Sequence, residues 1–164
     1  MENIDKHQVL HKLDSLRISY EVTEHTAVYT IEEMDKAGLP YSEAVCKNLF
    51  LRDAKGKRHF LVVLSKEKRA DLVALQTQLG CTKLGFASEE RLFTFLQLEK
   101  GAVTPLGILN DSLHAVEVVF DRDVVGRPRL GVHPCVNTAT VWISFDDLLR
   151  VIEENGNTVH TVDL

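Results

Sequence analysis

Residues 44–65, Ala-Val-Cys-Lys-Asn-Leu-Phe-Leu-Arg-Asp-Ala-Lys-Gly-Lys-Arg-His-Phe-Leu-Val-Val-Leu-Ser, decide the fold of this chain. Two apolar runs within them, residues 44–52 and 58–65, have the length and composition of buried β-strands. The polar segment 53–57 between the two runs contains a glycine, which is typical of a hairpin turn. We therefore expect a sheet built around this hairpin, with one charged residue, Lys47, inside its first strand.

The segments around the hairpin alternate between helical and extended patterns. Apolar spacing, capping residues and terminal glycines predict helices at residues 3–16 (with Asn3 or Asp5 as cap), 30–38, 67–79, 88–98 and 144–154. Further strands are expected at residues 19–24, 115–120, 138–143 and 158–162, with a short extended piece ending at 131–134. The sequence therefore predicts a single domain over residues 1–164, of the α+β class, with a mixed, largely antiparallel sheet flanked by helices.

The composition narrows the range of functions. Of 164 residues, 45% are hydrophobic and 26% are charged, a balance typical of a packed domain. No apolar run approaches the ~20 residues that span a bilayer, and the polar N-terminus lacks a secretory pattern, so we expect a cytoplasmic protein without a membrane partner. The net charge of −5 disfavours a general nucleic-acid binder. It leaves room for a local basic patch, for which the clusters at residues 55–58 and 66–69 are candidates.

Standard catalytic signatures are missing from the sequence, since it contains no G-x-S-x-G elbow, no P-loop and no G-x-G-x-x-G. The three cysteines are far apart and match no zinc-ligand spacing, so neither a metal nor a cofactor is expected. Lys47 remains unusual because a lysine among aliphatic residues is costly to bury. It is either an edge residue that reaches solvent or a fixed cation for a phosphate or carboxylate.

Two further segments stand out. Gly101–Gly107 has two glycines and a proline in an apolar stretch, which predicts an ordered loop whose backbone approaches another group closely. In Gly131–Asn137, a glycine and a proline flank His133 and restrict its position. Cys135 lies two residues from His133, but neighbours at that spacing do not point at each other, so a Cys-His nucleophile is disfavoured.

Taken in order, four pieces of this sequence resemble the YbaK-like editing-domain superfamily, which includes the editing domain of bacterial prolyl-tRNA synthetases and its stand-alone relatives. The pieces are His25–Thr30, Lys47–Leu51, Gly101–Gly107 and Gly131–Thr140. The resemblance covers nearly the whole chain and is greatest to the ProXp-ala (PrdX) branch of prolyl-tRNA deacylases. It implies hydrolysis of the ester that joins an amino acid to the 3′ end of a tRNA.

The resemblance also assigns residues to roles. It implies that Lys47 and His133 are catalytic: Lys47 matches a lysine thought to hold the terminal phosphate, and His133 a histidine that shapes the amino-acid pocket. The attack is expected to use water, assisted by the ribose 2′-hydroxyl of the substrate. The substrate-binding residues that it implies are Ile31, Asn48, Gly101, Val103, Thr104, Pro105, Gly107, Gly131, Pro134 and Asn137.

The substrate is expected to be tRNA(Pro) whose acceptor end carries alanine, because a synthetase pocket made for proline cannot strongly reject a smaller residue. Candidate pocket walls are Ile31, Met34, Val45, Leu49 and Val103, for each of which ordinary core packing is the alternative. Prolyl-tRNA synthetase is a candidate protein partner. Two other functions stay open: deacylation of cysteinyl-tRNA(Pro), and a non-catalytic module that binds tRNA or an aminoacyl group.

Overall fold

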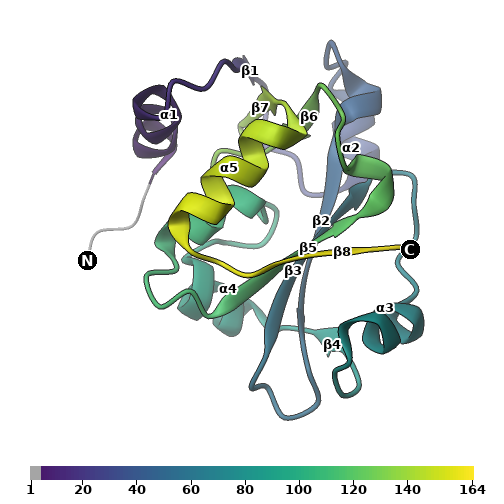
Figure 1. Cartoon of the computed structure of the whole chain (residues 1–164). Helices are drawn as coiled ribbons and strands as arrows, with labels where there is room; N and C mark the ends of the chain where they lie inside the picture. The colour runs from purple at the N-terminus through teal and green to yellow at the C-terminus, as the bar shows by residue number, and fades with distance from the viewer. Residues whose placement is uncertain (1–4) are drawn as a thin grey trace.

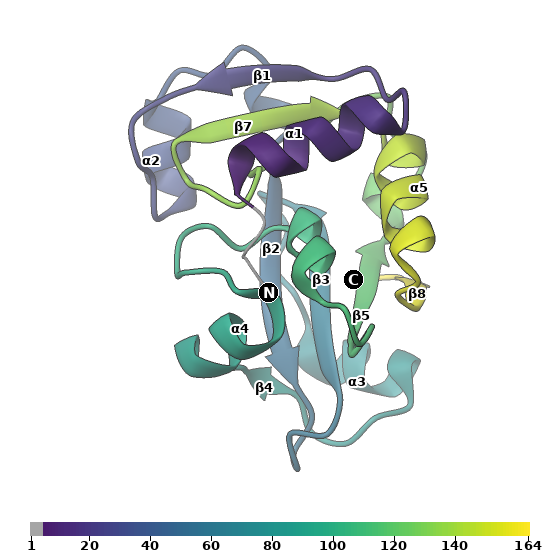
Figure 2. The same cartoon turned by 90° about the vertical axis from the view of Figure 1, so that its left-hand side faces the viewer.

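The computed structural model describes residues 5–164, whose strands form two sheets. The smaller sheet has the order β1-β7-β6, built from Glu21–Glu24, Ala139–Ile143 and Leu130–Val132, and both pairings are antiparallel. It lies at one end of the molecule, beside α1 (Lys6–Ser15) and α2 (Ile31–Lys36) (Figures 1 and 2).

The larger sheet has the order β4-β2-β3-β5-β8. Its strands are β4 (Gly85–Phe86), β2 (Cys46–Arg52), β3 (His59–Ser65), β5 (Val116–Asp121) and β8 (Val159–Val162). β2 is antiparallel to β3 and β4, whereas β3, β5 and β8 are parallel to one another. The predicted α+β class with mixed, largely antiparallel pairing is thus confirmed, with the strands divided between two sheets. An isolated parallel bridge between Val45 and Gly131 connects the sheets.

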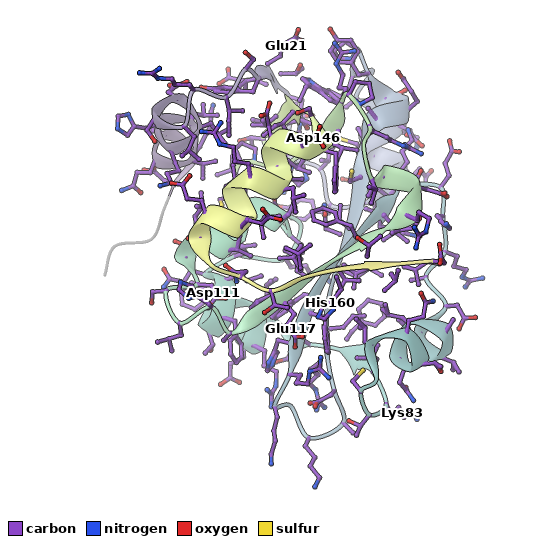
Figure 3. All side chains as sticks on the ribbon, viewed as in Figure 1. Glu21, Lys83, Asp111, Glu117, Asp146 and His160 are labelled. Atoms are coloured by element: carbon purple, nitrogen blue, oxygen red, sulfur yellow. The ribbon has the colours of Figure 1, made fainter. Side chains whose placement is uncertain are left out.

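The hairpin of β2 and β3 forms as the sequence predicts. Its register pairs Lys47 with Leu64 and, at the turn, Arg52 with His59. The Asp53 carboxylate closes the turn by accepting from the backbone N–H groups of Lys57 (2.8 Å) and Arg58 (3.2 Å). The Arg58 guanidinium is itself bound by Glu117 of β5, which also accepts from His160 of β8; Figure 3 shows Glu117 and His160 close together.

The helices begin at side-chain caps. Asp5, Thr30, Asp71, Ser88 and Ser144 each accept a backbone N–H at the start of α1, α2, α3 (Leu72–Leu79), α4 (Glu89–Leu96) and α5 (Phe145–Asn155). The predicted start of the third helix at residue 67 is wrong, because Asp71 accepts from Val73 and Ala74 and so begins the helix later. The alternative cap Asn3 lies outside the described residues.

Three short 3₁₀ helices complete the fold: η1 (Ser42–Ala44), η2 (Pro105–Asn110) and η3 (Arg122–Val124). The predicted loop 101–107 is therefore a loop only in its first half. The second half is helical because Thr104 caps η2 and Pro105 occupies its first turn, where the missing N–H costs nothing.

The core has three parts. The first cluster combines buried residues of α1, α4 and α5 with residues of both sheets, and the second lies on the opposite face of the larger sheet, against α3 through Leu75. A third cluster, around Trp142, joins α2 to the smaller sheet through Val28, Met34 and Val45. None of the helices in residues 5–164 has both the length and the apolar character to cross a membrane.

Candidate active site

A cavity of about 200 Å³ lies where α2, the start of β2 and the loop before η2 meet. Six residues predicted from the sequence line it, together with Met34 and Val45 from the proposed pocket walls. The six are Ile31, Lys47, Asn48, Gly101, Val103 and His133. The remaining lining residues are Val28, Tyr29, Thr30 and Cys46. The consecutive residues Cys46, Lys47 and Asn48 all line the cavity, although neighbours on a strand point to opposite faces, because the cavity lies at the end where β2 begins.

Four of the other predicted residues are buried beside the segments that form the cavity. Thr104, Pro105 and Gly107 are buried, and Gly107 packs so closely on Leu98 that an added Cβ would lie 2.6 Å from its Cδ1. Pro134 is buried as well. None of these four residues is among those that line the cavity.

Three more candidates have distinct positions. Gly131 lines a small neighbouring cavity, where an added Cβ would lie 2.4 Å from the Trp142 ring, so only glycine fits. Asn137 connects two chain segments and does not line the cavity. Leu49 packs on the α3 side of the larger sheet, so the alternative of ordinary core packing holds for it.

Thr104 and Asn137 bring the distant segments of the site together. The Thr104 hydroxyl donates to the His133 carbonyl oxygen over 2.5 Å and accepts from the Leu106 N–H over 3.3 Å. The Asn137 side-chain amide donates to the Val28 carbonyl oxygen over 3.0 Å, and the Val28 N–H donates to the Asn137 carbonyl oxygen. These bonds fix the loop before η2 and the segment before α2 relative to His133.

Gly101 is required by both its backbone and its surroundings. Its φ is +91°, a conformation that side chains other than glycine rarely adopt. An added Cβ would lie 2.6 Å from Cδ1 of Tyr29 and 3.3 Å from Nδ2 of Asn137. Tyr29, which is 64% exposed on the rim of the cavity, was not among the residues predicted for the site. Only its position in the segment His25–Thr30 marked it in the sequence.

His133 is held as a neutral imidazole with a defined tautomer. Its Nδ1 lies 2.9 Å from the Ala139 carbonyl oxygen, which can only accept, so Nδ1 carries the hydrogen. Burial lowers the pKa of His133, as does the neighbouring His25, while the Ala139 bond opposes the shift. At neutral pH the Nε2 atom is therefore an unprotonated acceptor.

Lys47 brings a positive charge to the cavity. Among residues 5–164 it forms no ion pair with a carboxylate. Its pKa is lowered, first by partial burial and second by the positive charge of Arg69. A cation without a counter-ion at the mouth of a cavity is suited to bind an anionic group of a ligand.

Asn48 and the loop before η2 supply uncharged polar groups. Asn48 Oδ1 is buried and has no hydrogen-bond partner in residues 5–164. Asn48 lines both the main cavity and the small one, which measures about 10 Å³. The backbone N–H groups of Gly101 and Val103 are likewise without an acceptor within the described part of the chain. Besides Lys47 and His133 Nε2, the cavity wall thus offers the Asn48 Oδ1 acceptor and the N–H donors of Gly101 and Val103.

Neither nearby cysteine is a nucleophile at neutral pH. Burial raises the pKa of the Cys46 thiol and of the Cys135 thiol, each to about 12. The thiolate is the nucleophilic form of cysteine, so both side chains are inert under these conditions.

A small cavity with one cation, a neutral histidine and free backbone donors suits hydrolysis of an activated ester at the end of an anionic polymer. The sequence profile of the aminoacyl-tRNA editing domain matches residues 25–151, and the chain belongs to this family. It is an aminoacyl-tRNA deacylase with tRNA as its substrate.

The relatives make the comparison more specific. The prolyl-tRNA editing protein ProX of Acetoanaerobium sticklandii is 52% identical over 159 residues, which cover 97% of each chain. A prolyl-tRNA synthetase associated domain-containing protein of Danio rerio is 38% identical and covers 89% of this chain and 80% of its own. A crystal structure provisionally assigned as a trans-editing enzyme for prolyl tRNA synthetase has the same fold, with a TM-score of 0.72 at 22% identity, over 99% of this chain and 98% of that one.

Proposed function

We propose that this deacylase acts in trans on alanyl-tRNA(Pro), releasing alanine and leaving a free 3′ end on the tRNA. The observation that carries the proposal is that Lys47, the 101–103 loop and His133 all line one small cavity. Its volume of about 200 Å³ is below the ~300 Å³ lower limit of ordinary ligand pockets, which favours a small aminoacyl group.

In the proposed mechanism, water attacks the ester carbonyl carbon and the bond to the ribose 3′-oxygen breaks. The proton that the water loses goes to the departing ribose oxygen. The negative charge that develops on the carbonyl oxygen needs preorganised donors, and the free N–H groups of Gly101 and Val103 can supply them. Because an aminoacyl ester is already activated, these donors and correct placement suffice without a protein nucleophile.

The other polar groups orient the substrate. Lys47 binds the phosphate of the terminal nucleotide, in agreement with its unpaired charge. Asn48 Oδ1 and His133 Nε2 are both acceptors at the cavity wall, and we propose that they accept hydrogen bonds from the α-ammonium group of the amino acid. A protonated His133 would repel that group, so the lowered pKa of His133 supports this arrangement.

The selectivity for alanine is proposed from the size of the cavity and from the name of the ProX relative, a prolyl-tRNA editing protein. Cysteinyl-tRNA(Pro) is the second candidate substrate, because cysteine is also small. We further propose prolyl-tRNA synthetase as a protein partner and the cytoplasm as the site of action, where mischarged tRNA arises.

The test is a deacylation assay with alanyl-, cysteinyl- and prolyl-tRNA(Pro), using the wild type and Lys47→Ala. We expect multiple turnovers of alanyl-tRNA, slow or no hydrolysis of prolyl-tRNA, and strong loss of activity in the variant. Faster turnover of cysteinyl-tRNA would assign the chain to the second substrate. Binding of tRNA without turnover of any charged form would support a non-catalytic module.

A further inference from the structure

The turn that follows β3 lies beside the start of β2. Ser65, the last residue of β3, pairs with Cys46, the neighbour of Lys47. The Lys68 N–H donates to the Ser65 carbonyl oxygen over 3.0 Å, which folds the chain back at this point. The basic cluster at residues 66–69 is therefore next to the candidate active site, whereas the cluster at 55–58 is at the opposite end of the hairpin.

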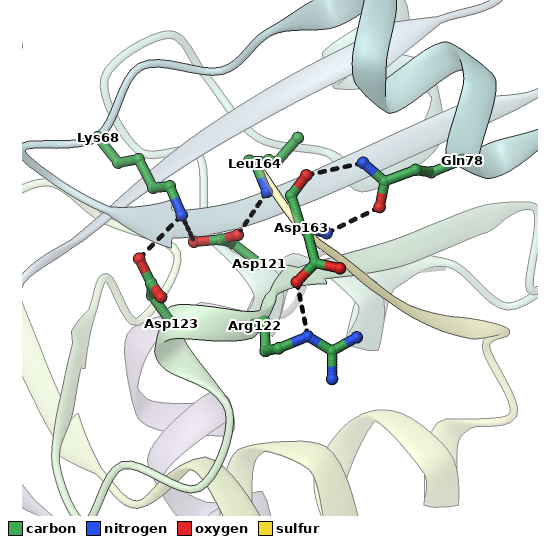
Figure 4. A network of polar contacts seen from close by, with 7 residues as sticks. All are labelled: Lys68, Gln78, Asp121, Arg122, Asp123, Asp163 and Leu164. Atoms are coloured by element: carbon green, nitrogen blue, oxygen red, sulfur yellow. Dashed lines mark hydrogen bonds and ion pairs between the residues drawn. The ribbon is translucent and has the colours of Figure 1, made fainter.

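The three cations of the turn differ in their partners. Lys66 forms an ion pair with Asp35 of α2 and its side chain is only 7% exposed. Lys68 binds both Asp121 and Asp123 at 2.8 Å, and Asp121 also accepts from the backbone N–H of Leu164 (Figure 4). Arg69 is exposed and forms no hydrogen bond or ion pair with any residue from 5 to 164.

Two positive charges thus remain uncompensated at this edge of the cavity. The charge of Arg69 is close enough to that of Lys47 to lower its pKa. The Asp35 carboxylate of α2 is engaged by Lys66 and forms no ion pair with Lys47 or Arg69. In a chain with 24 acidic and 19 basic residues, neighbouring cations without a counter-ion indicate a site for an external anion.

We infer that Arg69 binds a phosphate of the single-stranded 3′ end of the tRNA, adjacent to the phosphate bound by Lys47; the inference rests on the proposed function. A guanidinium binds phosphate oxygens through two parallel N–H donors, and this geometry can fix the direction in which the 3′ end of the tRNA runs. Arg69 is a positioning residue, since it directs the 3′ end into the cavity and does not reach the ester. Lys66 and Lys68 keep the turn in place.

The experiment compares Arg69→Gln with Lys83→Gln. Lys83 is an exposed cation that forms no hydrogen bond or ion pair with any residue from 5 to 164, and it lies near α3 and β4, far from α2 (Figures 1 and 3). The probes are uncharged tRNA(Pro) and the same tRNA shortened by its three 3′ nucleotides, each titrated at several salt concentrations. We expect Arg69→Gln to weaken binding of the full-length tRNA about tenfold and to reduce the salt slope by about 0.7, the value for one phosphate of a single strand.

The shortened tRNA should bind wild type and Arg69→Gln equally, and Lys83→Gln should behave as wild type with both probes. An equal loss of affinity for full-length and shortened tRNA would place Arg69 on the double-stranded stem and overturn the inference, as would unchanged affinity for the full-length form. Deacylation of alanyl-tRNA(Pro) by the wild type is measured in parallel. If the wild type does not turn over alanyl-tRNA(Pro), the proposed function is contradicted. If the wild type does turn it over but Arg69→Gln does not change the affinity for full-length tRNA, only the role of Arg69 is contradicted.

Discussion

Lys47 occupies a position where a charged side chain is costly, because it is partly buried and repelled by Arg69. Its replacement by an uncharged side chain of similar length should therefore separate activity from stability. For Lys47→Met we expect kcat/KM for alanyl-tRNA(Pro) to fall by roughly 10- to 150-fold, which corresponds to the ~1.5–3 kcal/mol of a charged hydrogen bond. The free energy of unfolding, measured with urea, should not decrease. A parallel loss of activity and stability would identify Lys47 as a structural residue.

His133 provides the second test at the residue scale. The bond from Nδ1 to the Ala139 carbonyl oxygen and the burial of the ring predict a neutral Nδ1–H tautomer with a pKa below the usual 6.5. Nitrogen-15 NMR of labelled protein distinguishes the two tautomers and follows the titration. We expect the Nδ1–H form at pH 7 and a midpoint below 6.5. An Nε2–H tautomer, or a midpoint at or above 6.5, would contradict the proposed acceptor role of Nε2.

At the scale of elements, the loop before η2 is placed by contacts that its own sequence does not reveal. The predicted glycine-proline segment correctly indicated a close backbone approach. Its partner, the Tyr29 ring, could not be predicted because the two meet only when Asn137 has joined the segment before α2 to the segment after β6. The role of the buried Thr104 hydroxyl could not be predicted for the same reason, since its acceptor is the carbonyl oxygen of His133, 29 residues away.

Local signals were reliable where the cause is local. The hairpin, the Thr30 and Ser88 caps and the glycine after α3 followed from residues within a few positions of each other. The division of the strands into two sheets was not predictable, because it depends on long-range pairings such as that of β1 with β7, which are more than 100 residues apart in the sequence. The late start of α3 was missed because Asp71, rather than a residue near 67, is the cap.

Gly101 and Gly126 form a matched pair for testing the loop. Both have positive φ, +91° and +77°, but an added Cβ meets Tyr29 at Gly101 and open space at Gly126. Alanine at either site should destabilise the protein by about 1–2 kcal/mol through backbone strain alone. Only Gly101→Ala should also displace the Tyr29 ring and lower kcat/KM, by about tenfold or more. Thermal unfolding and the deacylation assay measure the two effects, and equal activities of the two variants would contradict the importance of this contact.

At the scale of the whole molecule, a buried polar junction connects the end of η2 to β5 and β8. The Asp111 carboxylate accepts from the backbone N–H groups of Ala115 and Val116, and from the side-chain amide of Asn157. Asn157 also donates to the Val116 carbonyl oxygen. Since Asp111 and Asn157 are 4% and 5% exposed, loss of one partner leaves buried groups unsatisfied.

None of the residues of this junction lines the cavity, so we expect it to affect folding without affecting catalysis. For Asn157→Ala we expect the free energy of unfolding to fall by about 1–3 kcal/mol, measured with urea. At a temperature well below the unfolding midpoint, kcat for alanyl-tRNA(Pro) should equal that of wild type. A lower kcat in the fully folded variant would show that the junction determines the geometry of the loop that η2 follows.

The stability of the whole molecule should also depend on pH in a defined window. His59 is 1% exposed and packs against Phe95, with ring centroids 3.9 Å apart. Burial lowers its pKa and so does the charge of Arg91, while Asp53 opposes the shift. Because the folded pKa is below the unfolded value of about 6.5, the unfolded chain takes up the proton first as the pH falls. Stability from this group is therefore complete above pH 6.5 and is lost on acidification below it.

The carboxylates Glu117, Asp53 and Asp123, whose pKa values are also lowered, add their losses only at lower pH, below about 4.5. Urea unfolding at pH 7.5, 6.5 and 5.5 thus measures the contribution of the histidines to the free energy of unfolding separately from that of the carboxylates. Between pH 6.5 and 5.5 we expect His59→Gln to lose less stability than wild type, by at most about 1.4 kcal/mol per pH unit, the limit for one proton. If wild type and variant lose stability equally over this interval, His59 does not titrate with a lowered pKa, and its contacts with Arg91 and Phe95 do not favour the neutral ring.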